Sequence, residues 1–142
     1  MNYTQLIYVS DLRNKNSDED ELVSIVESAV RHNTEDNITG MLLYSGGNFL
    51  QVLEGSKELV HKTYDRIHLD PRHKNIILLT EEEVEERHFM NWSMGYRRLG
   101  KDDVAKFPSY APLFQFGFKA NDISAKSGVA LEMLKLFSKQ MT

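Results

Sequence analysis

A polar side chain sits at a position where the sequence pattern predicts burial. In the segment NFLQVLEG (48–55), the alternation typical of a β-strand places Gln51 on the same face as Phe49 and Leu53. A glutamine amide offers two N–H donors and an acceptor oxygen, and burying it without partners costs about 1–3 kcal/mol. Gln51 is therefore expected to bind something inside the protein.

A phenol and a second amide are expected in the same layer. Tyr8 lies in the apolar segment 5–10, which is typical of a strand, and Asn33 continues the apolar stripe of a predicted helix. If Tyr8 and Gln51 both point towards the helices, three polar groups converge on one apolar layer, where each needs a partner. They either satisfy one another or surround a planar ligand with donors and acceptors on one edge.

Charged residues cluster at the end of the second predicted helix. Arg66 and Asp70 are four residues apart, and Arg72 and His73 follow them. One interpretation is a surface ion pair worth less than about 1 kcal/mol. The other is a basic rim for a phosphate or a ribose-like tail.

Turn and capping residues divide the chain into alternating strands and helices. Gly46 and Gly47 predict a hairpin turn, Ser56 is a typical N-cap, and Pro71 disfavours helical geometry at Asp70. The predicted elements are strand 5–10, a helix capped by Ser17 with Leu22, Ile25, Val26, Ala29 and Asn33 on its apolar stripe, strands 38–45 and 48–55, helix 57–69, and strands 75–84 and 91–99.

The order β-α-β-β-α-β with an extra fifth strand predicts an α+β, ferredoxin-like fold. Two helices are expected to cover one face of an antiparallel sheet. The other face is also apolar and needs a cover, for which the amphipathic segment 124–141 is the candidate, with Ala130, Leu134, Phe137 and Met141 on one stripe. An aromatic segment, 107–118, is expected to be an ordered connector. We therefore expect a domain at 1–98 and a C-terminal connector and helical cap at 99–142.

Composition narrows the functional classes. The 142 residues fit one domain, and 41% hydrophobic residues favour a folded chain. A net charge of −4 argues against direct nucleic-acid binding, and the lack of cysteine excludes disulfides, thiolate metal sites and a cysteine nucleophile. Neither a signal peptide nor an apolar run of bilayer length is evident, so we expect a cytoplasmic protein without membrane contact.

Five segments occur in an order that resembles the BLUF family of blue-light sensors that use FAD. They are LIYVS (6–10), HN (32–33) before ITGMLLY (38–44), GNFLQVLEG (47–55), DPRH (70–73) and NWSM (91–94). The resemblance runs over about residues 3–98 and is more specific than any single motif. It implies a sensor rather than an enzyme, with a flavin ring between the two helices.

The resemblance also implies roles for individual residues. Tyr8 matches the photoactive tyrosine, Gln51 the glutamine between that tyrosine and the flavin, and Asn33 the asparagine on the pyrimidine edge. Trp92 and Met94 match a pair near the glutamine. On a strand over 91–99 they share a face and compete for the same space, and Trp92 could also donate an electron. The remaining expected flavin contacts are Ile25, His32, Phe49, Arg66, Ile67, Asp70, Arg72 and His73.

A mechanism follows from this resemblance and ordinary chemistry. Light excites the flavin, Tyr8 gives up an electron, and its proton leaves along Gln51. After the electron returns, the amide has rotated or tautomerised, and its stronger hydrogen bond to the flavin carbonyl gives a small red shift. We expect FAD, with FMN or riboflavin as alternatives. The last strand and the C-terminal helix are expected to signal to a partner, such as a response-regulator-like protein, and the chain to form a homo-oligomer.

Other functions are compatible with a ferredoxin-like order. An acylphosphatase-like enzyme needs a phosphate cradle after the first strand, where SDLRNKNSD (10–18) has Arg13 and Lys15 but no glycine. A flavin oxidoreductase is also possible, but this sequence supplies neither a nicotinamide site nor a Gly-rich phosphate turn. An RNA-binding module needs aromatic residues on the helix-free face, which offers Ile7 and Val9 instead. A yellow preparation would separate the flavin sensor from the acylphosphatase and RNA-binding alternatives.

Overall fold

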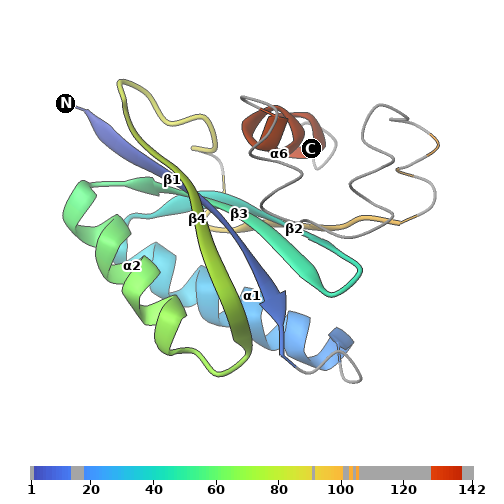
Figure 1. Cartoon of the computed structure of the whole chain (residues 1–142). Coiled ribbons are helices and arrows are strands. Elements are labelled where there is room, and N and C mark those ends of the chain that lie inside the picture. Colours follow the sequence, from blue (N-terminus) through green and yellow to red (C-terminus); the bar gives the residue numbers. More distant parts are fainter. Residues whose placement is uncertain are drawn as a thin grey trace.

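The computed structural model describes residues 2–13, 18–90, 92–100, 103, 105 and 129–138. Its elements follow the predicted β-α-β-β-α-β order, with a fifth strand and a C-terminal helix (Figure 1). The elements are β1 (Tyr3–Leu12), α1 (Asp18–Asp36), β2 (Thr39–Ser45), β3 (Asn48–Gly55), α2 (Lys57–Leu69), β4 (His73–Val84), β5 (Gly95–Arg98) and α6 (Val129–Ser138). The predicted Ser17 cap, the connector 107–118 and Met141 lie outside the described residues.

The five strands form one mixed sheet in the order β4-β1-β3-β2-β5. β1 pairs antiparallel with β3 and β4, and β2 pairs antiparallel with β3. The predicted antiparallel pairing is confirmed for β1 to β4, whereas β5 differs and runs parallel to β2. The chain leaves β4 beside Tyr3 and enters β5 beside Met41. The described residues between these two strands, 85–90 and 92–94, therefore cross one end of the sheet between its two edges, and we call them the crossing.

The hairpin between β2 and β3 fixes the register of the sheet centre. Gly46 and Gly47 have φ values of 58° and 88°, a left-handed pair that matches the twist of the flanking strands. Ser45 and Asn48 are paired directly across this turn. This confirms the predicted turn and sets the alternation of β3, so that Gln51 faces the helices.

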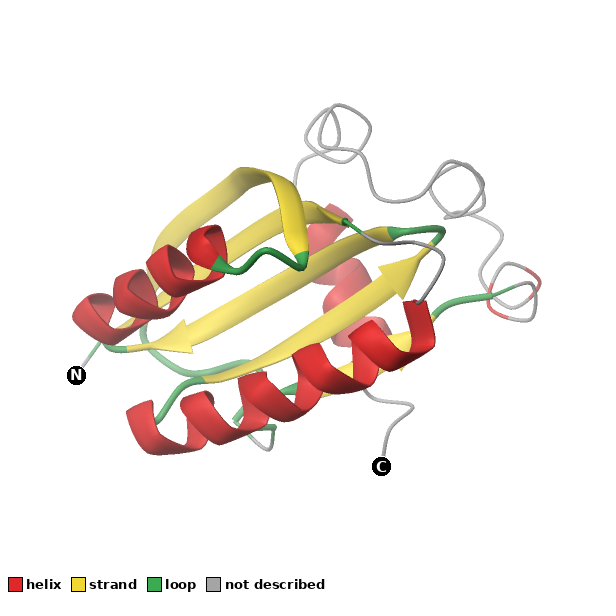
Figure 2. Ribbon diagram, turned by 90° about the horizontal axis from the view of Figure 1, so that it is seen from below, coloured by secondary structure: helices red, strands yellow, loops and turns green. Residues whose placement is uncertain are grey.

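The sheet is covered on both faces. α1 and α2 lie across one face, and α6 lies on the other (Figures 1 and 2). The helix-side core contains Leu6, Tyr8, Leu12, Leu22, Ile25, Ile38, Leu42, Tyr44, Phe49, Leu53, Val60 and Met94. The α6-side core contains Ile7, Val9, Met41, Leu43, Leu50, Val52, Phe89, Leu99, Ala130, Met133, Leu134 and Phe137. The C-terminal helix therefore covers the second apolar face, as predicted.

Capping residues set the limits of α2. The Ser56 hydroxyl accepts from the backbone N–H of Leu59, and the helix ends at Leu69, before the extended backbone of Asp70. The predicted helix 57–69 is confirmed. Its start and end matter for the site, because they determine where Thr63 and Asp70 face the sheet.

The predicted strand 91–99 is shorter in the structure. β5 begins at Gly95, since the residues before it bind other elements. The backbone N–H of Gly40 donates to the Trp92 carbonyl at 3.1 Å, and the Asn33 amide donates to the Ser93 carbonyl at 2.8 Å. These bonds hold residues 92–93 in an irregular crossing.

A buried carboxylate anchors the same crossing from the sheet. Glu54, which is 0% exposed, accepts from the backbone N–H groups of His88 and Phe89 and from the Gln5 amide, at 2.8–3.0 Å. Buried carboxylates require such donors, because water is excluded from them. Phe89 is thereby placed in the α6-side core.

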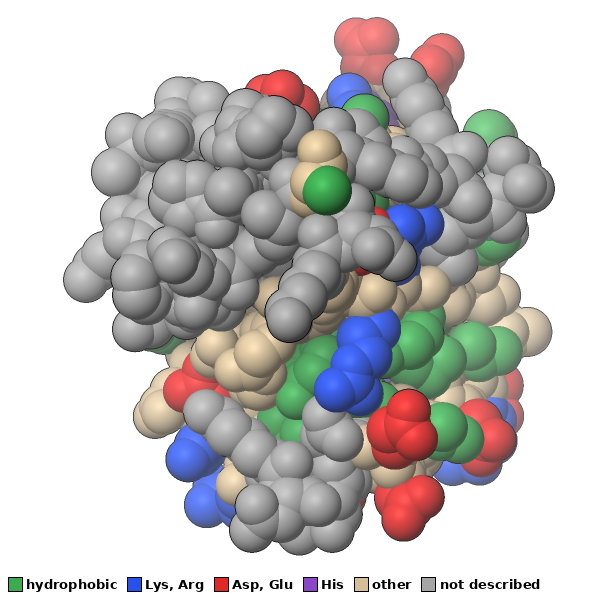
Figure 3. Space-filling view, turned by 90° about the vertical axis from the view of Figure 1, so that its right-hand side faces the viewer, with side chains coloured by type: hydrophobic (Ala, Val, Ile, Leu, Met, Phe, Trp, Pro, Cys, Tyr) green, Lys and Arg blue, Asp and Glu red, His purple; other side chains and the backbone are tan. Residues whose placement is uncertain are grey.

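The described surface is mixed in character. Figure 3 shows one face on which hydrophobic side chains gather, with basic and acidic side chains around them. Within the described ranges, no helix has both the length and the apolar character needed to span a bilayer.

Candidate functional site

A cavity of about 450 Å³ opens between α1 and α2, over the helix-facing side of β3. This volume lies within the range of about 300–1,000 Å³ found for small-molecule sites. Most of the predicted cofactor-binding residues line it, namely Ile25, Asn33, Gln51, Arg66, Ile67, Asp70, Arg72 and His73. Two others do not. Phe49 is buried against Tyr44 and His73, and His32 is half-buried on α1.

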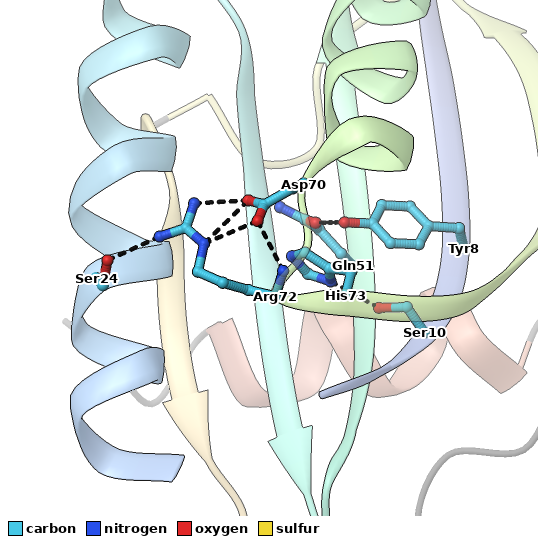
Figure 4. Close-up of polar contacts among 7 residues, drawn as sticks. All are labelled: Tyr8, Ser10, Ser24, Gln51, Asp70, Arg72 and His73. Carbon is cyan, nitrogen blue, oxygen red and sulfur yellow. Dashed lines mark hydrogen bonds and ion pairs between the residues drawn. The ribbon is translucent and has the colours of Figure 1, made fainter. Parts of the chain in front are cut away.

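Tyr8 and Gln51 form a buried hydrogen-bonded pair. They lie directly opposite each other in the β1–β3 ladder, and the Tyr8 hydroxyl donates to Gln51 Oε1 (Figure 4). Burial raises the pKa of Tyr8 well above its ordinary value, and the charge of Asp70 adds to this effect. The phenol is therefore protonated, and it can act as a donor to the amide.

The other end of the Gln51 amide contacts Met94. Gln51 Nε2 lies 3.3 Å from Met94 Sδ, which is a weak acceptor. The prediction that Trp92 and Met94 share a face and compete near Gln51 is wrong. Met94 belongs to the helix-side core, whereas Trp92 packs on the α6-side core. The irregular crossing before β5 turns the two side chains to opposite sides of the sheet.

Two polar atoms in the cavity wall have no hydrogen-bond partner among the described residues, Asn33 Oδ1 and Thr63 Oγ1. The orientation of Asn33 is determined, because its Nδ2 donates to the Ser93 carbonyl, which can only accept. Its oxygen is therefore left to the cavity. Buried polar atoms normally have partners, so these two indicate that a ligand with its own donors and acceptors belongs there.

An ion pair between Arg72 and Asp70 closes one end of the cavity. Arg72 binds both carboxylate oxygens of Asp70, at 2.6–3.1 Å, and its Nη1 donates to Ser24 of α1 at 2.7 Å (Figure 4). Partial burial favours a higher pKa for Asp70, but hydrogen bonds and charge from Arg72 outweigh it and lower the pKa. The site thus keeps a paired guanidinium and carboxylate beside the cavity.

Of the two interpretations left open for this cluster, the ion pair forms with a different arginine than the helical spacing indicated. Asp70 binds Arg72 instead, because a bidentate pair with a nearby guanidinium is stronger than a single contact along the helix. Arg66 lies 4.0 Å from Asp36 at the end of α1, and it is partly exposed. Arg66 therefore remains able to contact an anionic group at the cavity mouth.

His73 is a buried neutral imidazole. It is 5% exposed, and its Nδ1 lies 3.0 Å from the Ser10 hydroxyl. Burial lowers the pKa of His73 to about 4; Asp70 opposes this shift and Arg72 supports it. The ring therefore serves as a hydrogen-bonding wall of the cavity rather than a charge at neutral pH.

Further lining residues were not among the predicted site residues: Ser28, Ala29, Leu53, Thr63, Leu69 and Pro71. A helical-spacing signal existed for Thr63, which is three residues after Val60 and four before Ile67 on the inward stripe of α2. Ser28 and Ala29 follow Ile25 by three and four residues in the same way.

The lining fits a planar ligand with a polar edge and an anionic tail. Ile25 and Ile67 supply apolar surface on facing helices, Asn33 and Gln51 supply amides, and Arg66 lies at the rim. A flavin has these three parts. The orphaned Asn33 oxygen and the amide of Gln51 suit its edge, so the residues present fit this group.

Fold and site together define a ferredoxin-like ligand-binding domain built around a buried tyrosine–glutamine pair. A family model described as "BLUF: Sensors of blue-light using FAD" matches residues 3–95, and the chain belongs to this family. It is accordingly a flavin-binding blue-light sensor, and not the acylphosphatase-like or oxidoreductase alternative.

Relatives by sequence share this domain within longer proteins. The blue light- and temperature-regulated antirepressor BluF of Escherichia coli (strain K12) is 41% identical over 90 residues, which cover 61% of this chain and 21% of that protein. The photoactivated adenylate cyclase subunit beta of Euglena gracilis is 37% identical over 92 residues, 64% of this chain and 11% of that protein. The chain thus matches about a fifth or less of these relatives.

Two solved structures are matched over most of their own length. The photo-activated state of BlsA superposes with a TM-score of 0.78 at 28% identity, covering 96% of this chain and 94% of that one. The dark state of BlrB, a BLUF protein, gives a TM-score of 0.70 at 28% identity, covering 81% and 86%. These values support the same fold across the domain.

Proposed function

We propose that Tyr8 is the electron donor and Gln51 the proton relay with which this sensor converts absorbed blue light into a new hydrogen-bond pattern. The observation that carries the proposal is the buried hydrogen bond from the Tyr8 hydroxyl to Gln51 Oε1. It joins a redox-active phenol to an amide that also lines the cavity. A proton can therefore move between them without water.

FAD is the cofactor that we propose. Ile25 and Ile67 would hold the ring, Asn33 its polar edge, and Arg66, which is partly exposed at the cavity mouth, the phosphates. A bound flavin supplies the absorption of blue light and, once excited, an acceptor strong enough to take an electron from a phenol.

The protein's own residues do the rest. The raised pKa of Tyr8 keeps its proton in place in the dark. Loss of an electron makes the phenol strongly acidic, so its proton passes along the existing bond to Gln51 Oε1. Gln51 then rotates or tautomerises and changes its contact with Met94 Sδ. Tyr8 then regains the electron that the bound flavin would have accepted and a proton delivered back through Gln51, and the amide remains in its new arrangement.

We further propose that the signal leaves through Met94 and the rest of the crossing towards α6, and from there to a partner protein. The crossing contacts both cores, through Met94 on one side and Phe89 on the other. Relatives named as an antirepressor and as a cyclase subunit carry the domain in different longer proteins, which supports an output read by other protein surfaces. A response-regulator-like partner and a homo-oligomer stay predictions.

Difference absorption spectra before and after blue illumination test the proposal. The wild-type protein should show a small red shift, and Tyr8→Phe should lose it while keeping bound flavin. Tyr64→Phe is the matched control, because Tyr64 packs against Tyr8 with ring centroids 5.4 Å apart but is not the donor to Gln51. A normal shift in Tyr8→Phe would refute the assigned donor.

A further inference from the structure

Thr63 is a buried threonine whose hydroxyl has no partner within the described chain. It lies on α2, is 1% exposed, and lines the cavity. A threonine in a helix usually donates to the carbonyl four residues earlier, as Thr34 does to Val30 at 2.7 Å. Thr63 lacks even this local bond, so its hydroxyl is left to the cavity.

Thr63 and Asn33 lie at the same end of the cavity. Asp36, in the last turn of α1, is 3.8 Å from Lys62 and 4.0 Å from Arg66 on α2. At the other end, Ser24 of α1 binds Arg72, which follows α2. The two helices are therefore antiparallel, and the last turns of α1 lie against the middle of α2. The two orphaned atoms come from facing helices in this region.

The chemistry of the two atoms specifies the ligand edge. Asn33 Oδ1 can only accept, so it requires an N–H donor. The hydroxyl of Thr63 can donate, and the wall beside it is apolar, with Leu53 and Ile67. An N–H adjacent to a carbonyl, as in an imide, satisfies both atoms at once.

We propose that Thr63 is a further cofactor-binding residue. Its hydroxyl donates to a carbonyl oxygen of the ligand, on the same edge as the ligand N–H that binds Asn33 Oδ1. The inference rests on the proposed function in one respect, that the ligand is a flavin, since flavins carry such an imide. Thr63 would then help to select ligands by this edge rather than by their tail.

The alternative partner for the Thr63 hydroxyl is the phosphate-bearing tail of the ligand, because Arg66, the proposed phosphate contact, also lies at this end of the cavity. Riboflavin, FMN and FAD share the imide edge but differ in their phosphates. Their relative affinities therefore distinguish the two possibilities.

The test is a titration of flavin-free, full-length protein with riboflavin, FMN and FAD in the dark. Thr63→Val removes the hydroxyl at nearly constant volume and should raise the dissociation constant about fivefold for all three flavins. Thr63→Ser keeps the hydroxyl and should bind within about twofold of wild type. Thr34→Val is the matched helical control, and it should leave all three constants unchanged.

Stability without flavin provides an independent readout. Because Thr63→Val removes a buried donor that has no partner, its flavin-free Tm should rise by about 4 °C, in the opposite sense to its affinity. A structural role for the hydroxyl would instead lower that Tm and overturn the proposal. Unchanged affinity, or a loss confined to FMN and FAD, would overturn it as well.

These outcomes are separable from failure of the proposed function. If the wild-type protein binds flavin and shows the red shift, but Thr63→Val binds riboflavin equally well, the role of Thr63 alone is wrong. If the wild-type protein binds none of the three flavins, the proposed function fails, and this inference fails with it.

Discussion

Gln51 stands directly across the β1–β3 ladder from Tyr8 and accepts a hydrogen bond from its hydroxyl, while the opposite end of the amide contacts Met94. The amide therefore lies between a redox-active phenol and the crossing that leads to β5. A change in its orientation must alter both contacts.

Removal of the amide should abolish the light response. Gln51→Ala is expected to bind flavin but to show no red shift in difference absorption spectra, because the relay between Tyr8 and the cavity is gone. Gln5→Ala is the control. Gln5 is also a buried glutamine of the sheet, but its amide binds Glu54 rather than Tyr8. Its red shift should persist, and a normal shift in Gln51→Ala would exclude the relay.

Met94 and Trp92 should differ in their photochemical importance. Met94→Leu preserves volume but removes the sulfur that contacts Gln51 Nε2, so dark recovery measured by absorption should change severalfold. Trp92→Phe should recover at the wild-type rate, since Trp92 packs on the other side of the sheet. The reverse ranking would contradict the arrangement seen here.

Glu54 should be more important for stability than its surface neighbours. Glu54→Gln replaces an acceptor oxygen with an amide nitrogen that cannot accept from His88 or Phe89, and it should lower the free energy of unfolding by about 2–4 kcal/mol. Urea unfolding measures this change. Glu82→Gln, an exposed substitution on β4, should change it by less than about 0.5 kcal/mol. Equal effects would exclude Glu54 as an anchor.

His73 should make stability depend on pH. Its folded-state pKa of about 4 lies below its ordinary value of 6.5, so the unfolded chain binds more protons between these values. Stability should therefore be complete above about pH 6.5 and fall by about 3 kcal/mol as pH approaches 4. Asp70, whose pKa is lowered, acts in a still more acidic window.

His73→Gln should remove most of this slope between pH 6.5 and 4 in urea unfolding of flavin-free protein. Above pH 7, the variant and wild type should differ by a constant amount. A wild-type slope that persists in the variant would assign the titration to other groups.

α6 should contribute to the stability of the whole domain. Phe137 is fully buried in the core on the α6 side, and the Arg97 guanidinium lies 5.5 Å from its ring centroid. Phe137→Ala should lower the free energy of unfolding by about 3–5 kcal/mol. Leu136→Ala, at a half-buried position of the same helix, should cost clearly less, and equal losses would mean that α6 packs differently.

The sequence predicted the centre of the fold well because local signals there agree with one another. A Gly-Gly turn, a serine cap and a proline stop set the limits of β3 and α2, which match the predicted residues. Period-two alternation showed which strand residues share a face with Tyr8 and with Gln51. That both faces are the ones under the helices was an assumption, which the structure confirms. The inward position of Asn33 followed from helical spacing in the same way.

The sequence misled where long-range bonds override local pattern. Trp92, Ser93 and Met94 alternate like a strand, but bonds from Gly40 and Asn33 hold the crossing in irregular backbone. Asp70 binds Arg72 although the helical spacing favoured Arg66. The parallel pairing of β5 with β2 joins residues more than 50 positions apart in the sequence, so no local window contains it.

That parallel pairing has a consequence for how such domains combine with others. Because the polypeptide passes around the edge of the sheet before β5, the residue that contacts Gln51 and the start of the last strand share a single stretch of backbone. Gln51, Glu54 and Asn33 all contact this stretch of the chain. Any sequence that follows β5 therefore starts from a position that these three residues help to set. Different sequences after β5 are therefore compatible with the same cavity between α1 and α2.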